Sequence, residues 1–214
     1  MLKKLKIYII IIFILLPFNL SYSKTFDQKI DQIRGEIIKD DLKSAISLLK
    51  KIEIQSDSEQ EKIDLLFGDI YLKINKLQKA EDYYQKTFFT SSDEIESLTY
   101  IGLAEIRLLQ GKLNDAINYS EKSIKKNSLN IRPKIILAIA KTRIGEAEEG
   151  IKILNDLYDN RKDAEVALAI SDYYSSFDDN KQSIKILEDF IKRDPKNIKI
   201  LDQLARLHLI NGNK

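Results

Sequence analysis

The sequence contains no cysteine and no tryptophan, and it has one histidine, three prolines and seven glycines. The absence of cysteine excludes a disulfide-stabilised scaffold, a thiolate metal site, a cysteine nucleophile and a lipid-modified cysteine. A single histidine, His208, cannot build a Ser–His–Asp triad on a repeating helix face and makes a poor metal site. The scarcity of glycine and proline argues against a turn-rich β protein. We therefore expect no catalytic centre, no metal site and no cofactor.

The charges are nearly balanced, with 35 Lys and Arg against 33 Asp and Glu in 214 residues, a net charge of +2. Three of the basic residues, Lys3, Lys4 and Lys6, precede position 24, and no acidic residue does. The remainder of the chain therefore holds 32 basic and 33 acidic residues, a net charge of −1. This balance excludes a protein held to nucleic acid by bulk positive charge.

The first 23 residues have the pattern of a secretory signal peptide. The basic start is followed by an apolar run over residues 7–18, and Ser21 and Ser23 are small residues at the positions that signal peptidase inspects. The run of 12 residues is shorter than the roughly 20 that span a bilayer. We predict cleavage after Ser23 and export to the periplasm or another extracytoplasmic compartment. An uncleaved inner-membrane anchor and a buried helix are the alternatives.

From residue 24 onward, apolar residues recur three and four positions apart, which predicts amphipathic helices separated by short breaks. Turn residues recur at intervals of 35, 36, 34, 33 and 34 residues, at Asp40, Asn75, Gly111, Gly145, Asp178 and Gly212. A small residue stands five positions after each of the first five turns, at Ala45, Ala80, Ala116, Gly150 and Ser183. Small side chains at a fixed position predict that two helices pack closely in every unit.

This pattern resembles the tetratricopeptide repeat, a helix–turn–helix unit of about 34 residues. One unit matches through Phe67, Gly68, Tyr71, Ala80 and Tyr84, and another through Ile170, Tyr174, Ser183, Leu187, Ile191 and Pro195. The resemblance implies an all-α fold: an α-solenoid, a right-handed superhelix, of about five and a half repeats. The units are residues 26–59, 61–94, 97–130, 131–163 and 164–197, with a half unit at 198–214. Sel1-like and HEAT-like solenoids are the alternatives, and the periods of 33–36 residues disfavour both.

The resemblance implies that the first helix of each unit lines a concave groove for a peptide or protein segment. Residues about ten and six positions before each turn share one helix face, so we expect them to form the wall of this groove. In the four central units they are Leu65, Asp69, Ile101, Glu105, Ile135, Ile139, Leu168 and Asp172. The first unit has Ile30 and Arg34 there, and the half unit has Asp202 and Arg206. In an alternative interpretation, part of this stripe only packs between helices.

One variant of the family grips a C-terminal carboxylate with Lys, Asn and Arg side chains from successive units. The corresponding positions here hold Leu65, Asp69, Gly102, Arg132 and Ile136, of which only Arg132 is suitable. We therefore reject a carboxylate clamp.

The sequence predicts an exported, non-enzymatic bacterial scaffold or adaptor that holds a protein partner in its groove during assembly of an envelope complex. The alternatives are a membrane-anchored scaffold with an uncleaved N-terminal helix, and an accessory subunit or truncated fragment of a larger repeat protein. The C-terminal helix, Ile198–Ile210, is apolar nearly all round, and no second helix follows it. A homodimer through this helix, a docking surface for a partner and a truncated reading frame are three explanations.

Overall fold

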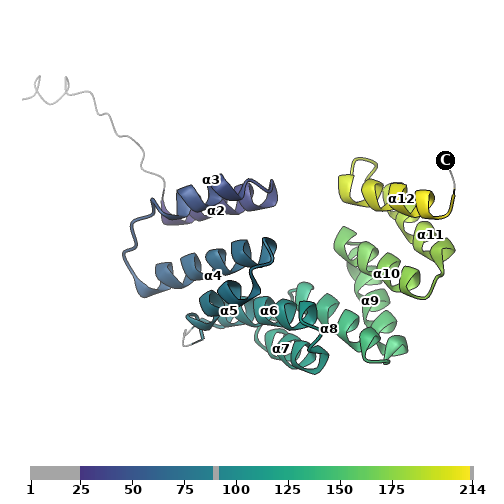
Figure 1. The fold of residues 1–214 in the computed structure, drawn as a ribbon, viewed down its shortest axis with the longest axis horizontal. Helices are drawn as coiled ribbons and strands as arrows, with labels where there is room; N and C mark the ends of the chain where they lie inside the picture. The colour runs from purple at the N-terminus through teal and green to yellow at the C-terminus, as the bar shows by residue number, and fades with distance from the viewer. Residues whose placement is uncertain (1–24, 89–91, 213–214) are drawn as a thin grey trace, which may run out of the picture. The chain divides into compact units, whose positions relative to one another are not determined.

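The structure, a computed structural model, describes residues 25–88 and 92–212 (Figure 1). All regular elements in these ranges are α-helices, and the predicted all-α solenoid fold is confirmed. The bounds are α2 Phe26–Ile38, α3 Leu42–Leu49, α4 Asp57–Lys73, α5 Leu77–Gln85, α6 Asp93–Leu109, α7 Leu113–Lys126, α8 Arg132–Arg143, α9 Ala147–Arg161, α10 Ala164–Ser176, α11 Asn180–Ile191 and α12 Ile198–Ile210. The predicted signal peptide, residues 1–23, lies outside the described residues. No helix within the described ranges combines the length and the hydropathy that a membrane span requires.

The chain divides into two compact units, Met1–Glu53 and Ile54–Lys214. The first contains the helix pair α2 and α3, which pack on each other. In the second, α4, α6, α8, α10 and α12 contact one another in succession and form an inner layer. The helices α5, α7, α9 and α11 contact the inner helices beside them and not one another, so they form an outer layer (Figure 1). This two-layer stacking of helix pairs is the arrangement of an α-solenoid.

The predicted turn residues all adopt a left-handed backbone. Their φ angles are 65° at Asp40, 56° at Asn75, 72° at Gly111, 99° at Gly145, 59° at Asp178 and 71° at Gly212. Glycine reaches this region without steric cost, and Asn and Asp tolerate it better than other residues do. The spacing of these residue types along the sequence is therefore explained by the backbone that the turn between two helices requires.

Serine side chains cap the N-termini of two inner helices, as the polar breaks in the sequence predict. Ser56 Oγ accepts the backbone N–H of Glu59 at the start of α4, and Ser92 Oγ accepts that of Ile95 at the start of α6. Acidic residues in both first turns interact favourably with the helix dipole. Both helices are 17 residues long. The helix α4 begins at Asp57, before the predicted unit boundary at residue 61, and α6 begins at Asp93, before the predicted boundary at residue 97. The outer helices α5, α7 and α9 have no side-chain cap, because they follow Lys76, Lys112 and Glu146.

Small side chains lie where the two helices of a pair cross. Ala80, Ala116 and Ser183 have no exposed surface. At Gly150 of α9, an added Cβ would lie 2.7 Å from the carbonyl oxygen of Ala138 and would also collide with Thr142 Oγ1. The predicted close approach of paired helices is confirmed, and at Gly150 the neighbour is helix backbone that cannot rotate away.

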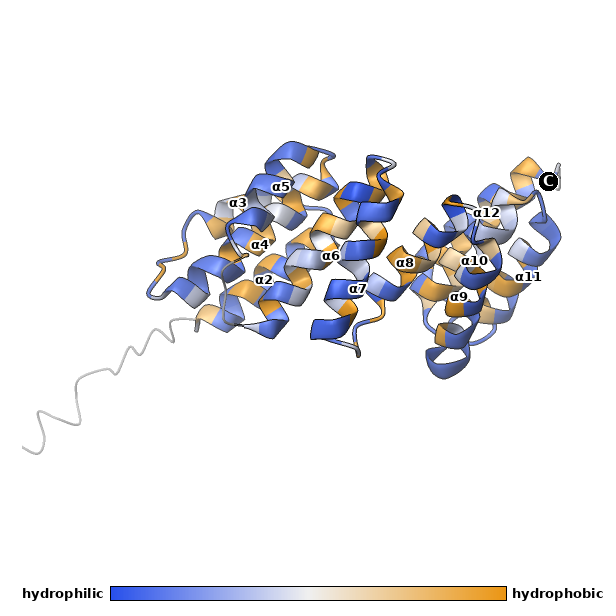
Figure 2. Cartoon of the chain, turned by 90° about the horizontal axis from the view of Figure 1, so that it is seen from below, coloured by the Kyte–Doolittle hydropathy of each residue, from blue (hydrophilic) through white to orange (hydrophobic). Residues whose placement is uncertain are grey.

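Apolar residues cover much of α8, whereas outer helices such as α7 and α11 are strongly two-sided (Figure 2). The reason is that α8 contacts helices on several sides: α6, α7, α9 and α10. Its residues Ile135, Ile136, Ala138 and Ala140 are buried. A helix surrounded in this way loses the single apolar stripe that marks a surface helix.

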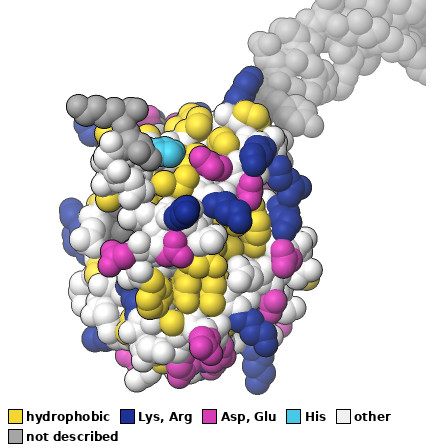
Figure 3. All heavy atoms as spheres, turned by 90° about the vertical axis from the view of Figure 1, so that its right-hand side faces the viewer, with side chains coloured by type: hydrophobic (Ala, Val, Ile, Leu, Met, Phe, Trp, Pro, Cys, Tyr) yellow, Lys and Arg dark blue, Asp and Glu magenta, His cyan; other side chains and the backbone are white. Residues whose placement is uncertain are grey.

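One face of α12 is buried against the neighbouring helices, and apolar residues near its C-terminal end are exposed. Ile200, Leu204 and Leu207 are buried against α10 and α11, whereas Leu209 is 72% exposed and Ile210 is 73% exposed. The face of the molecule on this side shows apolar surface among charged side chains (Figure 3). The homodimer through Ile198–Ile210 stays a prediction.

The contact at Gly150 generates a matched pair of stability predictions. We expect Gly150→Ala to lower the free energy of unfolding by about 1–3 kcal/mol, because its methyl group overpacks a helix crossing. Gly35→Ala is the control, because a Cβ at Gly35 in α2 would meet nothing within 4 Å. It should leave stability unchanged or raise it by up to about 1 kcal/mol. Urea unfolding followed by circular dichroism measures both, and equal stability of the two variants would contradict the close approach.

Candidate functional site

Four of the predicted groove residues occupy equivalent positions on successive inner helices. Asp69 lies on α4, Glu105 on α6, Ile139 on α8 and Asp172 on α10, and each of these helices contacts the next. Asp69 and Asp172 are exposed, whereas Glu105 and Ile139 are partly buried. We refer to the surface defined by these four residues as the inner face.

The apolar residues predicted one helical turn earlier lie deeper. Leu65, Ile101 and Ile135 are only 5–6% exposed and belong to the hydrophobic clusters between helices. Leu168 of α10 is partly buried and packs beside a cluster formed by α10, α11 and α12. Leu65, Ile101 and Ile135 therefore hold neighbouring helices together and offer little surface to a ligand.

The carboxylate of Asp69 is engaged by a side chain of the outer layer. Tyr84 of α5 is 1% exposed, and its hydroxyl donates a hydrogen bond of 2.7 Å to Asp69 Oδ1. The Tyr84 ring fits between α4 and α6 because Gly68 and Gly102 have no side chains, and a Cβ on either would collide with it. Burial, reinforced by the negative charge of Asp69, raises the pKa of the Tyr84 phenol. Tyr84 therefore stays a neutral hydrogen-bond donor.

Glu105 forms an ion pair with Arg132 of α8, in which one guanidinium nitrogen contacts both carboxylate oxygens. Arg132 Nη2 lies 2.7 Å from Glu105 Oε1 and 2.8 Å from Glu105 Oε2. The pair joins two successive inner helices, α6 and α8. Arg132, the one residue suited to a carboxylate clamp, is thus already bound to a carboxylate of its own chain.

Asp172 is different, because no cationic side chain pairs with it among the described residues. It accepts a hydrogen bond of 3.1 Å from the Gln203 Nε2 amide of α12. Although the Asp172 side chain is exposed, partial desolvation raises the pKa of its carboxyl group above the ordinary value. Asp172 therefore presents a carboxylate whose negative charge is not neutralised within the described chain.

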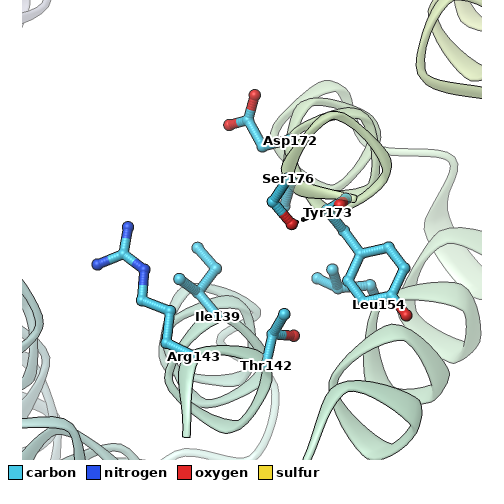
Figure 4. A pocket seen from close by; sticks show the side chains of 8 residues that line it. Ile139, Thr142, Arg143, Leu154, Asp172, Tyr173 and Ser176 are labelled. Carbon is cyan, nitrogen blue, oxygen red and sulfur yellow. Dashed lines mark hydrogen bonds between the residues drawn. The ribbon is translucent and has the colours of Figure 1, made fainter. Parts of the chain in front are cut away.

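A cavity of about 150 Å³ opens beside Asp172, between α8, α9 and α10. The apolar residues Ile139, Leu154 and Ala169 line it, together with Thr142, Arg143, Asp172, Tyr173 and Ser176. Figure 4 shows Arg143 and Asp172 on the side of the cavity away from α9, and the Tyr173 ring and Leu154 on the α9 side. The cavity thus combines an apolar interior with one basic and one acidic group near its opening.

The sequence prediction included Ile139 and Asp172 but missed Arg143, Thr142 and Tyr173. Helical periodicity could have found Arg143, because it follows Ile139 by four residues on the same face. Thr142 and Tyr173 had no such signal. Their place in the cavity depends on how α8, α9 and α10 pack.

His208 lies apart from the inner-face cavity. It lines a shallow surface hollow with residues of α11, among them Lys185 and Glu188. Within residues 25–88 and 92–212, no cluster of His, Asp and Glu side chains has an arrangement that could hold a metal ion.

No family model matches the sequence, and no curated protein matches it. Solved structures do match its fold. The chain is similar to TTC0263, a thermophilic tetratricopeptide repeat protein of Thermus thermophilus, with a TM-score of 0.75 and 11% identity over 86% of this chain and 100% of that chain. It is also similar to a Rap protein solved with competence and sporulation factor, with a TM-score of 0.66 and 14% identity over 87% and 60% of the two chains. A third similar structure is the Cut9–Hcn1 tetramer of APC/C, with a TM-score of 0.64 and 18% identity over 86% and 36%. The chain is thus a helical repeat protein with the tetratricopeptide repeat fold.

The environment of Asp172 predicts a pH-dependent gain of stability on substitution. Because partial desolvation raises its pKa in the folded chain, ionisation of Asp172 opposes folding at neutral pH by a small amount that solvent screening limits, and this cost vanishes below the ordinary value of 3.8. Asp172→Asn should therefore unfold at a higher urea concentration than the wild type at pH 7, and the difference should shrink as the pH falls toward 3.8. Asp156→Asn, at an exposed position of α9, is the control. A lower stability of Asp172→Asn at pH 7 would contradict the prediction.

Proposed function

We propose that this protein is a non-enzymatic scaffold that binds a segment of a partner protein along the inner face formed by α4, α6, α8 and α10. The single observation that carries the proposal is the cavity between α8 and α10, which joins apolar surface to charged groups with no ion-pair partner in the described chain. Open apolar surface costs free energy in water unless a ligand covers it. A protein segment supplies apolar and charged groups together, which a purely apolar or purely ionic ligand does not.

The two ends of the inner face make different contributions. On α4 and α6, Asp69 and Glu105 are engaged by Tyr84 and Arg132, and these contacts fix the positions of neighbouring helices. On α8 and α10, the charged groups at the cavity, Arg143 and Asp172, have no ion-pair partner among the described residues. We therefore place the main contacts with the partner at α8 and α10.

The similar folds support the choice of a protein partner. The Rap structure contains competence and sporulation factor, and the Cut9 structure contains Hcn1. These are the binding partners of the Cut9 and Rap proteins themselves. Here they support a scaffold role, and the partner of the present chain is defined only by the chemistry of its inner face.

A matched pair of double variants tests the scaffold. Ile139→Asn with Asp172→Lys changes the inner face, and Ile153→Asn with Asp156→Lys makes the same substitutions on α9 of the outer layer. Both pairs join a partly buried isoleucine to an exposed aspartate. After cross-linking in cells and mass spectrometry, we expect the inner-face variant to recover about tenfold less partner, since about 1.4 kcal/mol corresponds to tenfold in affinity. The α9 variant should retain the partner.

Circular dichroism controls for the fold of both variants. If the folded inner-face variant recovers every partner at the wild-type level, the inner face does not bind them and the proposal is wrong.

We further propose that the scaffold works outside the cytoplasm, in the assembly of an envelope complex. The support is the N-terminal pattern of basic residues, a short apolar run and small residues at Ser21 and Ser23. N-terminal sequencing of the protein purified from its cells should give Lys24 as the first residue. A chain that retains Met1 or begins at residue 2 would contradict cleavage and favour the anchored form.

A further inference from the structure

The size of the inner-face cavity limits what can enter it. An apolar cavity of about 150 Å³ holds a molecule the size of benzene, whereas pockets for whole small ligands or cofactors measure about 300–1,000 Å³. At about 150 Å³, the cavity between α8, α9 and α10 therefore accommodates one side chain. Leu154 is 1% exposed and Ala169 is 7% exposed, so an entering group meets packed apolar atoms.

Two of the three hydroxyl groups at the cavity, those of Thr142 and Ser176, are already used as hydrogen-bond donors. Thr142 Oγ1 donates to the carbonyl oxygen of Ala138 at 2.9 Å, and Ser176 Oγ donates to that of Tyr173 at 2.7 Å. Both bonds lie within a helix. Besides the Tyr173 hydroxyl, the groups left for polar recognition at the cavity are the charged side chains.

Arg143 and Asp172 are those charged side chains. Across residues 25–88 and 92–212, Arg143 has no ion pair or hydrogen bond through its side chain, and Asp172 has only the amide of Gln203. The two groups come from different helices, α8 and α10, and are not paired with each other. This contrasts with Glu105 and Arg132, which satisfy one another on the same face. Two unneutralised charges of opposite sign therefore flank a cavity sized for one side chain.

We propose that the cavity takes one aliphatic side chain, of about the size of leucine, from an extended segment of a partner protein. In that segment an acidic residue on one side of the anchor pairs with Arg143, and a basic residue on the other side pairs with Asp172. The inference rests on the proposed function and adds the chemistry of the bound segment to it. Charge complementarity identifies the occupant: the apolar anchor fills the cavity, and each flanking charge meets the one cavity group of opposite sign.

Selection from a library of random heptapeptides displayed on phage tests this proposal with the purified chain. We expect enrichment of peptides that carry an aliphatic residue with an acidic residue on one side and a basic residue on the other. An enriched peptide is then synthesised with a fluorophore, and fluorescence anisotropy gives its affinity for each variant.

Charge reversal should change the selected sequence in a defined way. Arg143→Glu should weaken the selected peptide about tenfold or more and should favour a basic residue in place of the acidic one. Asp172→Lys should have the mirror effect on the basic residue. Arg161→Glu and Asp156→Lys are the controls with the same change in net charge at exposed positions of α9, and the peptide should bind both as it binds the wild type.

Filling the cavity tests the anchor. Ala169→Leu places a larger side chain inside it and should abolish binding of the peptide. Because Ala169 is buried and this variant could unfold, Ser176→Phe provides a second test from an exposed position at the cavity edge. Thermal unfolding followed by circular dichroism shows whether each variant is folded.

Three outcomes would overturn the inference. Peptides that bind Arg143→Glu and Asp172→Lys with wild-type affinity would show that the two charges do not select the segment, while the scaffold function could still hold. Free L-leucine that displaces the peptide at an equal concentration would show a small-molecule site instead. Failure to enrich any peptide would also refute the inference. The proposed function itself fails only if the folded Ile139→Asn, Asp172→Lys variant also keeps every cellular partner.

Discussion

The close crossing of paired helices underlies every other feature of the architecture. A helix pair can approach closely only where the facing side chains are small, and Ala80, Ala116 and Gly150 meet this condition in successive units. The left-handed turn before each of them reverses the chain within a few residues. The two features together place each outer helix against its partner. The inner helices can then contact one another and form a continuous face.

Some charged side chains of the inner face are bound to groups of the same chain, and others have no ion-pair partner among the described residues. Glu105 and Arg132 form an ion pair between α6 and α8, and the Tyr84 hydroxyl of the outer layer donates a hydrogen bond to Asp69 of the inner layer. These contacts satisfy polar groups that packing has brought together. Around the cavity at α8 and α10 the same positions carry Ile139 and Asp172, and Asp172 has no cation beside it within the described chain. The side chains that can still bind a partner therefore lie on α8 and α10, where ion pairs within the chain no longer engage them.

Asp172 shows why such a position indicates function. Partial desolvation raises the pKa of this exposed carboxyl group, so its ionised form has a small stability cost at neutral pH, and no ion pair within the described chain offsets it. Side chains with perturbed pKa values cluster at functional sites. Arg143, on the adjacent inner helix, likewise has no ion-pair partner among the described residues.

Part of the inner face could be predicted from the spacing of residues in the sequence. Each inner helix from α4 to α10 has one predicted residue six positions before its turn: Asp69, Glu105, Ile139 and Asp172. The repeat period alone was therefore enough to place them at equivalent positions on consecutive inner helices. Leu65, Ile101 and Ile135 obey the same periodicity but are buried. One helical turn along the same stripe separates core from surface, and the boundary depends on how near the next inner helix lies. That distance is a property of packing and has no signature in a single helix.

The repeat, its turns and the helices that carry them can be read directly from the sequence, because they follow from local rules. Left-handed backbone selects Gly, Asn and Asp, and amphipathic helices show a period of 3.6 residues. The pairing of charges and the opening of a cavity emerge only once the helices are stacked. Arg132 and Arg143 stand at the two ends of the same helix, yet one is neutralised by Glu105 of α6 and the other lies open beside α10. The reason is that pairing depends on atoms from different units, brought within reach only by tertiary packing.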